Sequence, residues 1–323
     1  MIPHDWIIAA GERLHGRVIR TPVTFDDALG CYLKWENQQE TGSFKLRGAL
    51  NKVLTLQPWE RELGLVAASA GNHGQGVAVA ARLLGLKAIV FASEHAVPAK
   101  IMAMRSLGAE VRLISGGYEQ AEQAGIRFAA EQGMTWISPY NDGQVIAGQA
   151  TVGLELMDEI PAEDLEAVVV PVGGGGLIAG IGLALQQLPK EHRPRLIGVQ
   201  SEASPYFHAL LKTGSQDGVK ETESLADGLA GRIEDNAITI PLVRSLVDEV
   251  LLVGEIEIEK AVAAAWHRYG AIIEGSAAVV LAAALGGKFA QRPAALVISG
   301  GNIQPELHAQ LVKRWPRSEG VSG

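Results

Sequence analysis

The chain has 323 residues, of which 47% are hydrophobic and 20% charged, so it is long enough for about two globular domains and too apolar to be disordered. Its 28 basic and 36 acidic residues give a net charge of −8, which disfavours nucleic acid as a partner. The single cysteine, Cys31, excludes an internal disulfide, and the N-terminus has no basic region followed by an apolar run. We therefore expect a cytoplasmic protein.

Short apolar runs alternate along the chain with helical patterns, which is typical of an α/β protein with mostly parallel strands. Strands are expected at 65–69, 88–91, 111–114, 168–172, 196–200, 250–253 and 296–299, and helices at 76–84, 118–132, 143–159 and 257–269. The uncharged stretch 167–189 is long enough to cross a membrane. Pro171 and the glycines after it predict a strand, a loop and a helix there instead, so no membrane partner is expected. In such sheets ligands bind beyond the carboxyl ends of the strands, and three loops with that placement stand out.

The first segment of interest begins a helix after residue 43. The apolar positions of this helix share one face: Leu46, Ala49, Leu50, Val53 and Leu54. Ser43 is the expected N-cap, which places Lys45 in the first turn. A cation is unfavourable there, because the helix dipole presents positive charge at this end. Lys45 is therefore either a residue that extends to water or an amine with a lowered pKa that serves as a nucleophile.

The second segment, Ser-Ala-Gly-Asn-His-Gly-Gln-Gly at 69–76, follows a predicted strand and opens an alanine-rich helix. Its small residues leave backbone N–H groups free to point at an anion. The alternative is a capped turn between a strand and a helix. Within it, His73 is either a base or a structural hydrogen bonder beside the helix start.

The third segment is the glycine run 173–176 after the predicted strand 168–172. A Walker A loop is excluded because no Gly-Lys-Ser/Thr follows, and the relaxed dinucleotide pattern that ends at Ala179 lacks an acidic residue about 20 positions on. Four successive glycines favour a phosphate cup of another type, in which backbone amides surround the anion. Near the end of the chain, Ser299 precedes two glycines and Asn302 at the end of a strand, which suits a side chain aimed into a ligand site.

Together these motifs resemble the fold-type-II pyridoxal-phosphate enzymes, in particular the serine/threonine dehydratase and serine racemase branch. The matching pieces occur in family order at 34–37, 41–49, 69–74, 145–149, 173–177, 226–228 and 299–302. The resemblance implies a two-domain α/β fold like that of the tryptophan synthase beta subunit. Residues 1–41 and 147–323 would form a large pyridoxal-phosphate-binding domain, and residues 42–146 a small domain. The family also suggests a homodimer or a homotetramer.

The resemblance also implies site residues. Lys45 and Ser69 would be catalytic, with Lys45 holding the cofactor as a Schiff base. The implied cofactor-binding residues are Lys45, Phe44, Asn72, Gly173, Gly174, Gly175, Gly176, Leu177, Glu274 and Ser299. The implied substrate-binding residues are Ser69, Ala70, Gly71, Asn72, His73 and Gly228. In this scheme the glycine run and Leu177 bind the phosphate, Phe44 packs beside the ring, Asn72 binds its 3′-oxygen and Ser299 its nitrogen.

The implied reaction is pyridoxal-phosphate-dependent β-elimination from L-threonine or L-serine, which gives a 2-oxo acid and ammonia. Alternatives are a larger β-hydroxy amino acid (3-hydroxyaspartate, a phenylserine or a hydroxyectoine-derived compound) and a cofactor-carrying binding protein without turnover. A distal carboxylate would need a basic partner, for which Arg105 and Arg127 are candidates.

Two departures from the racemase pattern narrow the expectation. Serine racemases carry a second serine where this chain has Ala70, so we predict elimination without appreciable racemisation. Their acidic metal ligand after a Gly-Val pair is replaced by Gln200, so no metal is expected there, although Glu202 is close by.

Overall fold

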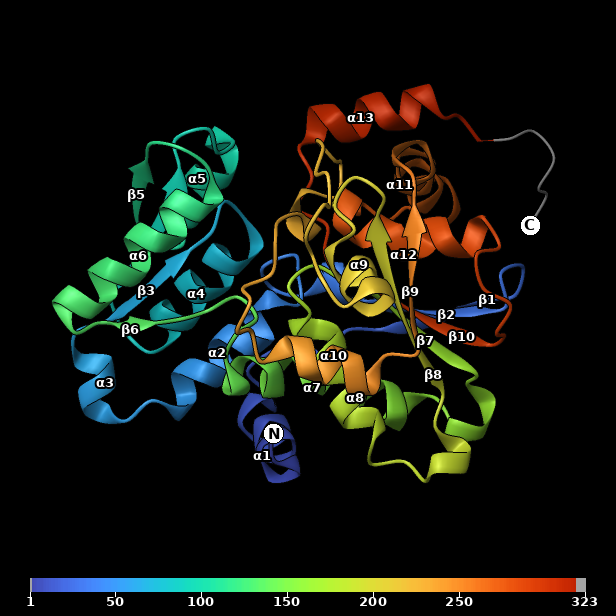
Figure 1. The fold of residues 1–323 in the computed structure, drawn as a ribbon, viewed down its shortest axis with the longest axis horizontal. Helices are drawn as coiled ribbons and strands as arrows, with labels where there is room; N and C mark the ends of the chain where they lie inside the picture. The colour runs from blue at the N-terminus through green and yellow to red at the C-terminus, as the bar shows by residue number, and fades with distance from the viewer. Residues whose placement is uncertain (1, 318–323) are drawn as a thin grey trace.

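The computed structural model describes residues 2–317, and the chain forms two mainly parallel sheets that lie side by side (Figure 1). The larger sheet has the strand order β1-β2-β10-β7-β8-β9, in which only β1 and β2 pair in antiparallel fashion. Its strands are β1 (Val23–Asp26), β2 (Cys31–Trp35), β7 (Ala167–Pro171), β8 (Arg195–Ser201), β9 (Glu249–Val253) and β10 (Ala294–Ile298). The smaller sheet has the order β5-β4-β3-β6, and all its neighbours are parallel. Its strands are β3 (Leu65–Ala68), β4 (Ala88–Ser93), β5 (Glu110–Ile114) and β6 (Thr135–Trp136).

Helices cover both sheets, as parallel strands require. Those near the small sheet are α2 (Lys45–Thr55), α3 (Pro58–Glu62), α4 (Asn72–Leu83), α5 (Pro98–Ser106) and α6 (Tyr118–Gln132). The others are α1 (His4–Leu14), α7 (Gly143–Glu159), α8 (Gly176–Leu185), α9 (Tyr206–Thr213), α10 (Thr239–Leu246), α11 (Glu255–Tyr269), α12 (Gly275–Leu285) and α13 (Pro305–Arg314). In Figure 1, α2 and α7 lie between the two sheets. The predicted boundary between residues 146 and 147 falls inside α7, and the division into two domains stays a prediction.

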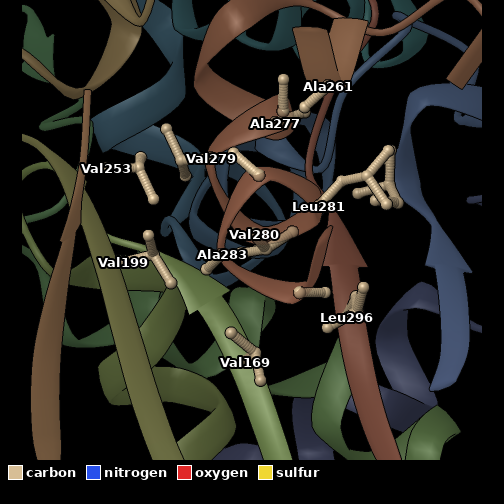
Figure 2. Close-up of a cluster of buried hydrophobic side chains, with 14 of the residues drawn as sticks. Val169, Val199, Val253, Ala261, Ala277, Val279, Val280, Leu281, Ala283 and Leu296 are labelled. Carbon is tan, nitrogen blue, oxygen red and sulfur yellow. The ribbon is translucent and has the colours of Figure 1, made fainter. Parts of the chain in front are cut away.

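The largest buried cluster surrounds α12, which is apolar on all sides. Figure 2 shows its residues Val279, Val280 and Leu281 among side chains from β7, β8, β9, β10 and α11. A helix that is hydrophobic all round is expected to be buried, and Gly275 to Ala284 of α12 are all buried. This packing holds the first turn of α12, and Glu274 just before it, against the ends of the central strands.

Most predicted elements are confirmed. The helices at 118–132 and 143–159 have the predicted bounds, and the stretch 167–189 is strand β7, a loop and helix α8. No helix among residues 2–317 is long and apolar enough to cross a membrane. Three strands were not predicted, and β2 shows why: it carries Lys34, a charged residue at a fully buried position. Its burial depends on ion pairs with distant residues, which an apolar pattern does not reveal.

Candidate active site

Lys45 is the first residue of α2, directly beside the end of β10. The backbone N–H of Phe44 donates to the carbonyl of Ser299 at 3.1 Å, and Ser43 forms a bridge with Gly300. The prediction of Ser43 as N-cap is wrong. Phe44 precedes the helix with helical dihedral angles, and the buried Ser43 hydroxyl has no partner among the described residues, because the bridge to Gly300 directs the segment along the strand end.

No carboxylate among residues 2–317 lies in hydrogen-bond contact with the Lys45 amine. Its Nζ donates to the carbonyl of Pro139 at 3.2 Å and lies 5.1 Å from the centre of the Phe44 ring. Desolvation lowers the pKa of Lys45 to about 8, and the carboxylate of Glu274 offsets part of that effect. The sequence correctly placed Lys45 in the first turn, but burial rather than the helix dipole is the main cause of the lowered pKa.

The glycine loop after β7 leads into α8 and is closely covered by neighbouring side chains. A Cβ on Gly174 would overlap the ring of Tyr140, and Gly175 has a left-handed φ of +85°, so both positions require glycine. Among the described residues, no acceptor takes the backbone N–H groups of Gly174, Gly175 or Gly176. These free donors at the start of an apolar, buried helix suit an anion.

Asn72, Glu274 and Asn302 form a hydrogen-bonded group that joins the two sheets. The Asn72 amide donates to Glu274 Oε1 at 2.7 Å and accepts from Asn302 Nδ2 at 2.7 Å. Asn302 also donates to the carbonyl of Thr41 at 2.8 Å. Glu274 is 7% exposed, and desolvation followed by the charge of Asp227 raises its pKa to about 7. The carboxyl therefore gains or loses a proton near neutral pH.

The segment 69–73 lies between β3 and α4. The backbone N–H of Gly71 donates to the Ser69 hydroxyl at 3.0 Å, and α4 begins at Asn72, so its first N–H groups face this loop. The His73 ring is buried, its Nε2 is paired with the carbonyl of Ile137 at 2.8 Å, and desolvation lowers its pKa to about 3. Its imidazole is thus neutral and engaged in a structural hydrogen bond.

Gly228 approaches the glycine loop from η4 (Asp227–Leu229). Its N–H donates to the hydroxyl of Ser276 at 3.0 Å, and its carbonyl lies 3.2 Å from where a Cβ on Gly173 would be. The preceding Asp227 forms an ion pair with Lys100 of α5 at 2.8 Å. Hence the loops after β3 and β7, the start of α2 and η4 meet at one place.

Two residues after Lys45 on α2, Arg47 lies in a closed cluster of charges. Its guanidinium binds both oxygens of Glu36 at 2.8 Å and both oxygens of Glu155 at 2.6 and 2.9 Å. Arg47 and Glu36 have fully buried side chains, and the two carboxylates raise the pKa of Arg47 further above its ordinary value. Lys34 joins the cluster through Glu155 at 2.6 Å. The cluster ties α2 to β2 and α7.

Other residues weighed from the sequence lie elsewhere. Arg105 on α5 and Arg127 on α6 are exposed. The side-chain amide of Gln200 donates to the carbonyl of Val172 at 3.1 Å and accepts from the backbone N–H of His208 at 2.9 Å. Both its nitrogen and its oxygen are therefore hydrogen-bonded to the backbone. The absence of a metal there stays a prediction.

The predicted residues at Lys45, 69–73, 173–177, Gly228, Glu274 and Ser299 therefore border a common region. Sequence reasoning missed Tyr140, Pro139 and Lys100. Tyr140 and Pro139 lie in an irregular loop between β6 and α7, and Lys100 is one of several lysines on helix surfaces. Nothing in the local sequence distinguishes them.

Comparisons with known proteins identify the family of this chain. The family model described as "Pyridoxal-phosphate dependent enzyme" matches residues 15–300. An L-threonine ammonia-lyase of Thermotoga maritima is 40% identical over 97% of this chain and 79% of its own length. A catabolic L-threonine dehydratase of Escherichia coli is 39% identical over 95% of each chain. The solved structure of maize serine racemase superposes with a TM-score of 0.88 at 30% identity, over 96% of each chain.

Proposed function

Since the chain belongs to the family of pyridoxal-phosphate dependent enzymes, we propose that it deaminates L-threonine or L-serine. β-Elimination releases water and leaves an enamine, and hydrolysis of the imine that follows takes up water and releases ammonia, so that the net products are a 2-oxo acid and ammonia. Its similarity to threonine ammonia-lyases over most of both chains supports this substrate class. The observation that carries the proposal is Lys45, a partly buried amine that has no carboxylate partner among the described residues and lies near a glycine loop with unused N–H groups.

The site residues fit pyridoxal phosphate. The free N–H groups of 174–176 suit its phosphate, and the amine of Lys45 suits its aldehyde. The Ser299 side chain, 4% exposed at the end of β10, suits the ring nitrogen, and the amide of Asn72 suits the 3′-oxygen. When bound, the cofactor supplies an electrophilic carbon for an amine and a conjugated ring that withdraws electrons from the α-carbon.

Lys45 acts as nucleophile and then as general base in this proposal. An amine must be neutral for either task, and desolvation makes it neutral at lower pH than an exposed lysine. When its amine is not bonded to the cofactor, Nζ of Lys45 takes the proton from the α-carbon of the substrate. Phe44 and Pro139, which both contact Lys45, restrict where the amine can go.

The loop 69–73 binds the substrate carboxylate through the N–H groups at the start of α4. The Ser69 hydroxyl is fixed by Gly71, and Asn72 is fixed by Glu274 and Asn302. His73 contributes only its backbone, because its neutral ring is paired with Ile137. Gly228 lies on the side of the substrate site opposite the loop 69–73, near the reacting carbons. We include Ser69, Ala70 and Gly71 in the substrate site on this basis.

Ser299 favours elimination over transamination. A carboxylate at this position would stabilise a proton on the ring nitrogen and hence a long-lived negative charge on the substrate carbon. A hydroxyl does so far less, so the neighbouring hydroxyl group of the substrate leaves promptly.

Racemisation is the second candidate, because maize serine racemase is structurally similar. Ala70 argues against it, since a methyl group has no proton to give to the opposite face of the substrate. We therefore propose a lyase with negligible formation of D-serine. Chiral chromatography of an L-serine reaction checks this point, and D-serine forming at a rate comparable to ammonia release would refute it.

The direct test is a panel of β-hydroxy amino acids with detection of 2-oxo acid and ammonia by the loaded enzyme. We expect turnover of L-threonine and L-serine above that of a phenylserine and 3-hydroxyaspartate. Preference for a larger substrate would replace the proposed one. Absorbance of bound cofactor without turnover of any substrate would indicate a binding protein.

We further propose that the protein works in the cytoplasm as a homodimer or homotetramer and needs no nucleic acid or membrane. The free, buried thiol of Cys31 supports a reducing compartment. Light scattering of the purified protein measures its oligomeric state.

A further inference from the structure

One ion pair connects the two halves of the molecule beside the proposed site. Lys100 on α5 belongs to the small-sheet half and Asp227 on η4 to the large-sheet half, 127 positions apart in the chain. Their Nζ and Oδ2 atoms are 2.8 Å apart. The Lys100 side chain is 20% exposed and that of Asp227 is 62% exposed. A pair this accessible contributes little to stability, so its position calls for another explanation.

The Lys100 side chain runs along the proposed substrate loop. A Cβ placed on Gly71 would lie 3.7 Å from Cδ and 3.9 Å from Nζ of Lys100. Asp227 directly precedes Gly228, which contacts the glycine loop. Both charges also act on the buried carboxyl of Glu274, which is bonded to Asn72. The approach of Lys100 to Gly71 and the position of Asp227 next to Gly228 therefore place this ion pair at the edge of the proposed substrate space.

The Lys100–Asp227 pair determines the electrostatic environment of the substituent on the substrate β-carbon. Lys100 lies beside the proposed substrate loop, and its ammonium is paired with the carboxylate of Asp227. A β-substituent without charge, such as the hydrogen of serine or the methyl of threonine, is indifferent to this pair. A β-carboxylate meets the anion of Asp227, and like charges at close range repel strongly.

We propose that Asp227 is a specificity-determining residue that excludes β-hydroxy amino acids with a second carboxylate by occupying Lys100. This inference rests on the proposed function. Removal of the negative charge at 227 frees the Lys100 ammonium to form a charge-assisted hydrogen bond with a β-carboxylate.

The test compares wild type with Asp227→Asn, using ammonia release from L-threonine and from L-threo-3-hydroxyaspartate. We expect the ratio of kcat/KM for the dicarboxylic substrate to that for threonine to rise by roughly tenfold or more, mainly through a lower KM. Adding Lys100→Ala to Asp227→Asn should abolish the gain. Asp227→Ser removes the same charge with a smaller side chain and should raise the ratio as well.

Glu40→Gln is the matched control, because Glu40 forms a partly exposed pair with Arg82 outside the site. It should leave the ratio unchanged. An Asp227→Asn enzyme that loses kcat on both substrates equally, with an unchanged ratio, would overturn the inference, since the pair would then only bridge the two halves. Wild type without turnover of threonine or serine would instead refute the proposed function.

Discussion

Lys45 and Arg47 are two residues apart on α2, yet their charged groups have opposite environments. Arg47 has a fully buried side chain and is bound by both oxygens of two carboxylates, Glu36 and Glu155. Among the described residues, the amine of Lys45 has a backbone carbonyl as its one hydrogen-bond partner, and its pKa falls to about 8. A buried cation with a full set of partners stays charged and stabilises the structure, whereas a partly buried, desolvated amine without such partners becomes reactive. The comparison predicts that activity depends on Lys45 and stability on Arg47.

The largest expected effect is on activity. Lys45→Ala removes both nucleophile and base, so kcat/KM for L-threonine should fall by at least about a thousandfold. Stability should be retained or raised. A lysine whose folded pKa lies below its unfolded value destabilises the folded state at pH values below the folded pKa, and the substitution removes that effect. Turnover assays and urea unfolding at pH 7 measure both. Substantial remaining turnover would remove Lys45 from the mechanism.

Arg47→Met should have the opposite effect to Lys45→Ala and should reduce stability rather than activity. It leaves Glu36 and Glu155 buried without their partner, so the free energy of unfolding should fall by about 3–5 kcal/mol. Urea unfolding checks this value. Arg47→Lys, which keeps the charge but loses the bidentate contacts, should be intermediate. A loss of activity with unchanged stability would mean that Arg47 acts on the reaction and that the contrast with Lys45 is wrong.

A smaller effect concerns the titration of Lys45 in the cofactor-free protein. Labelling of its amine by acetic anhydride, followed by mass spectrometry, should rise with a midpoint at about pH 8. In urea the midpoint should move toward the ordinary lysine value near 10.5. Glu274→Gln should shift the folded-state midpoint to lower pH, because the carboxylate of Glu274 raises the pKa of Lys45. A midpoint near 10 in the folded wild type would show that Lys45 is an ordinary solvated lysine.

The fold, and which loops meet at the candidate site, could be predicted because their signals are local. The helices 118–132 and 143–159 have the predicted bounds, since the spacing of their apolar residues and the clear turns on either side determine where each helix begins and ends. The order of the glycine and serine motifs at strand ends led to the same loops that meet in the structure. Local reasoning failed where tertiary contacts override it. Ser43 does not cap α2 because it pairs with Gly300, which lies far away in sequence.

The sequence by itself determined the α/β pattern, the placement of Lys45 in a first helical turn and the resemblance to pyridoxal-phosphate enzymes. Only the tertiary structure decided which charged residues lie together. The carboxylate partner of Arg47 on α7 is 108 positions away, the partner of Lys100 is 127 positions away, and the partners of Asn72 are 202 and 230 positions away. An ionisable group's pKa depends on desolvation and on charges within a few ångströms, and for these residues the two sheets bring those charges together only on folding.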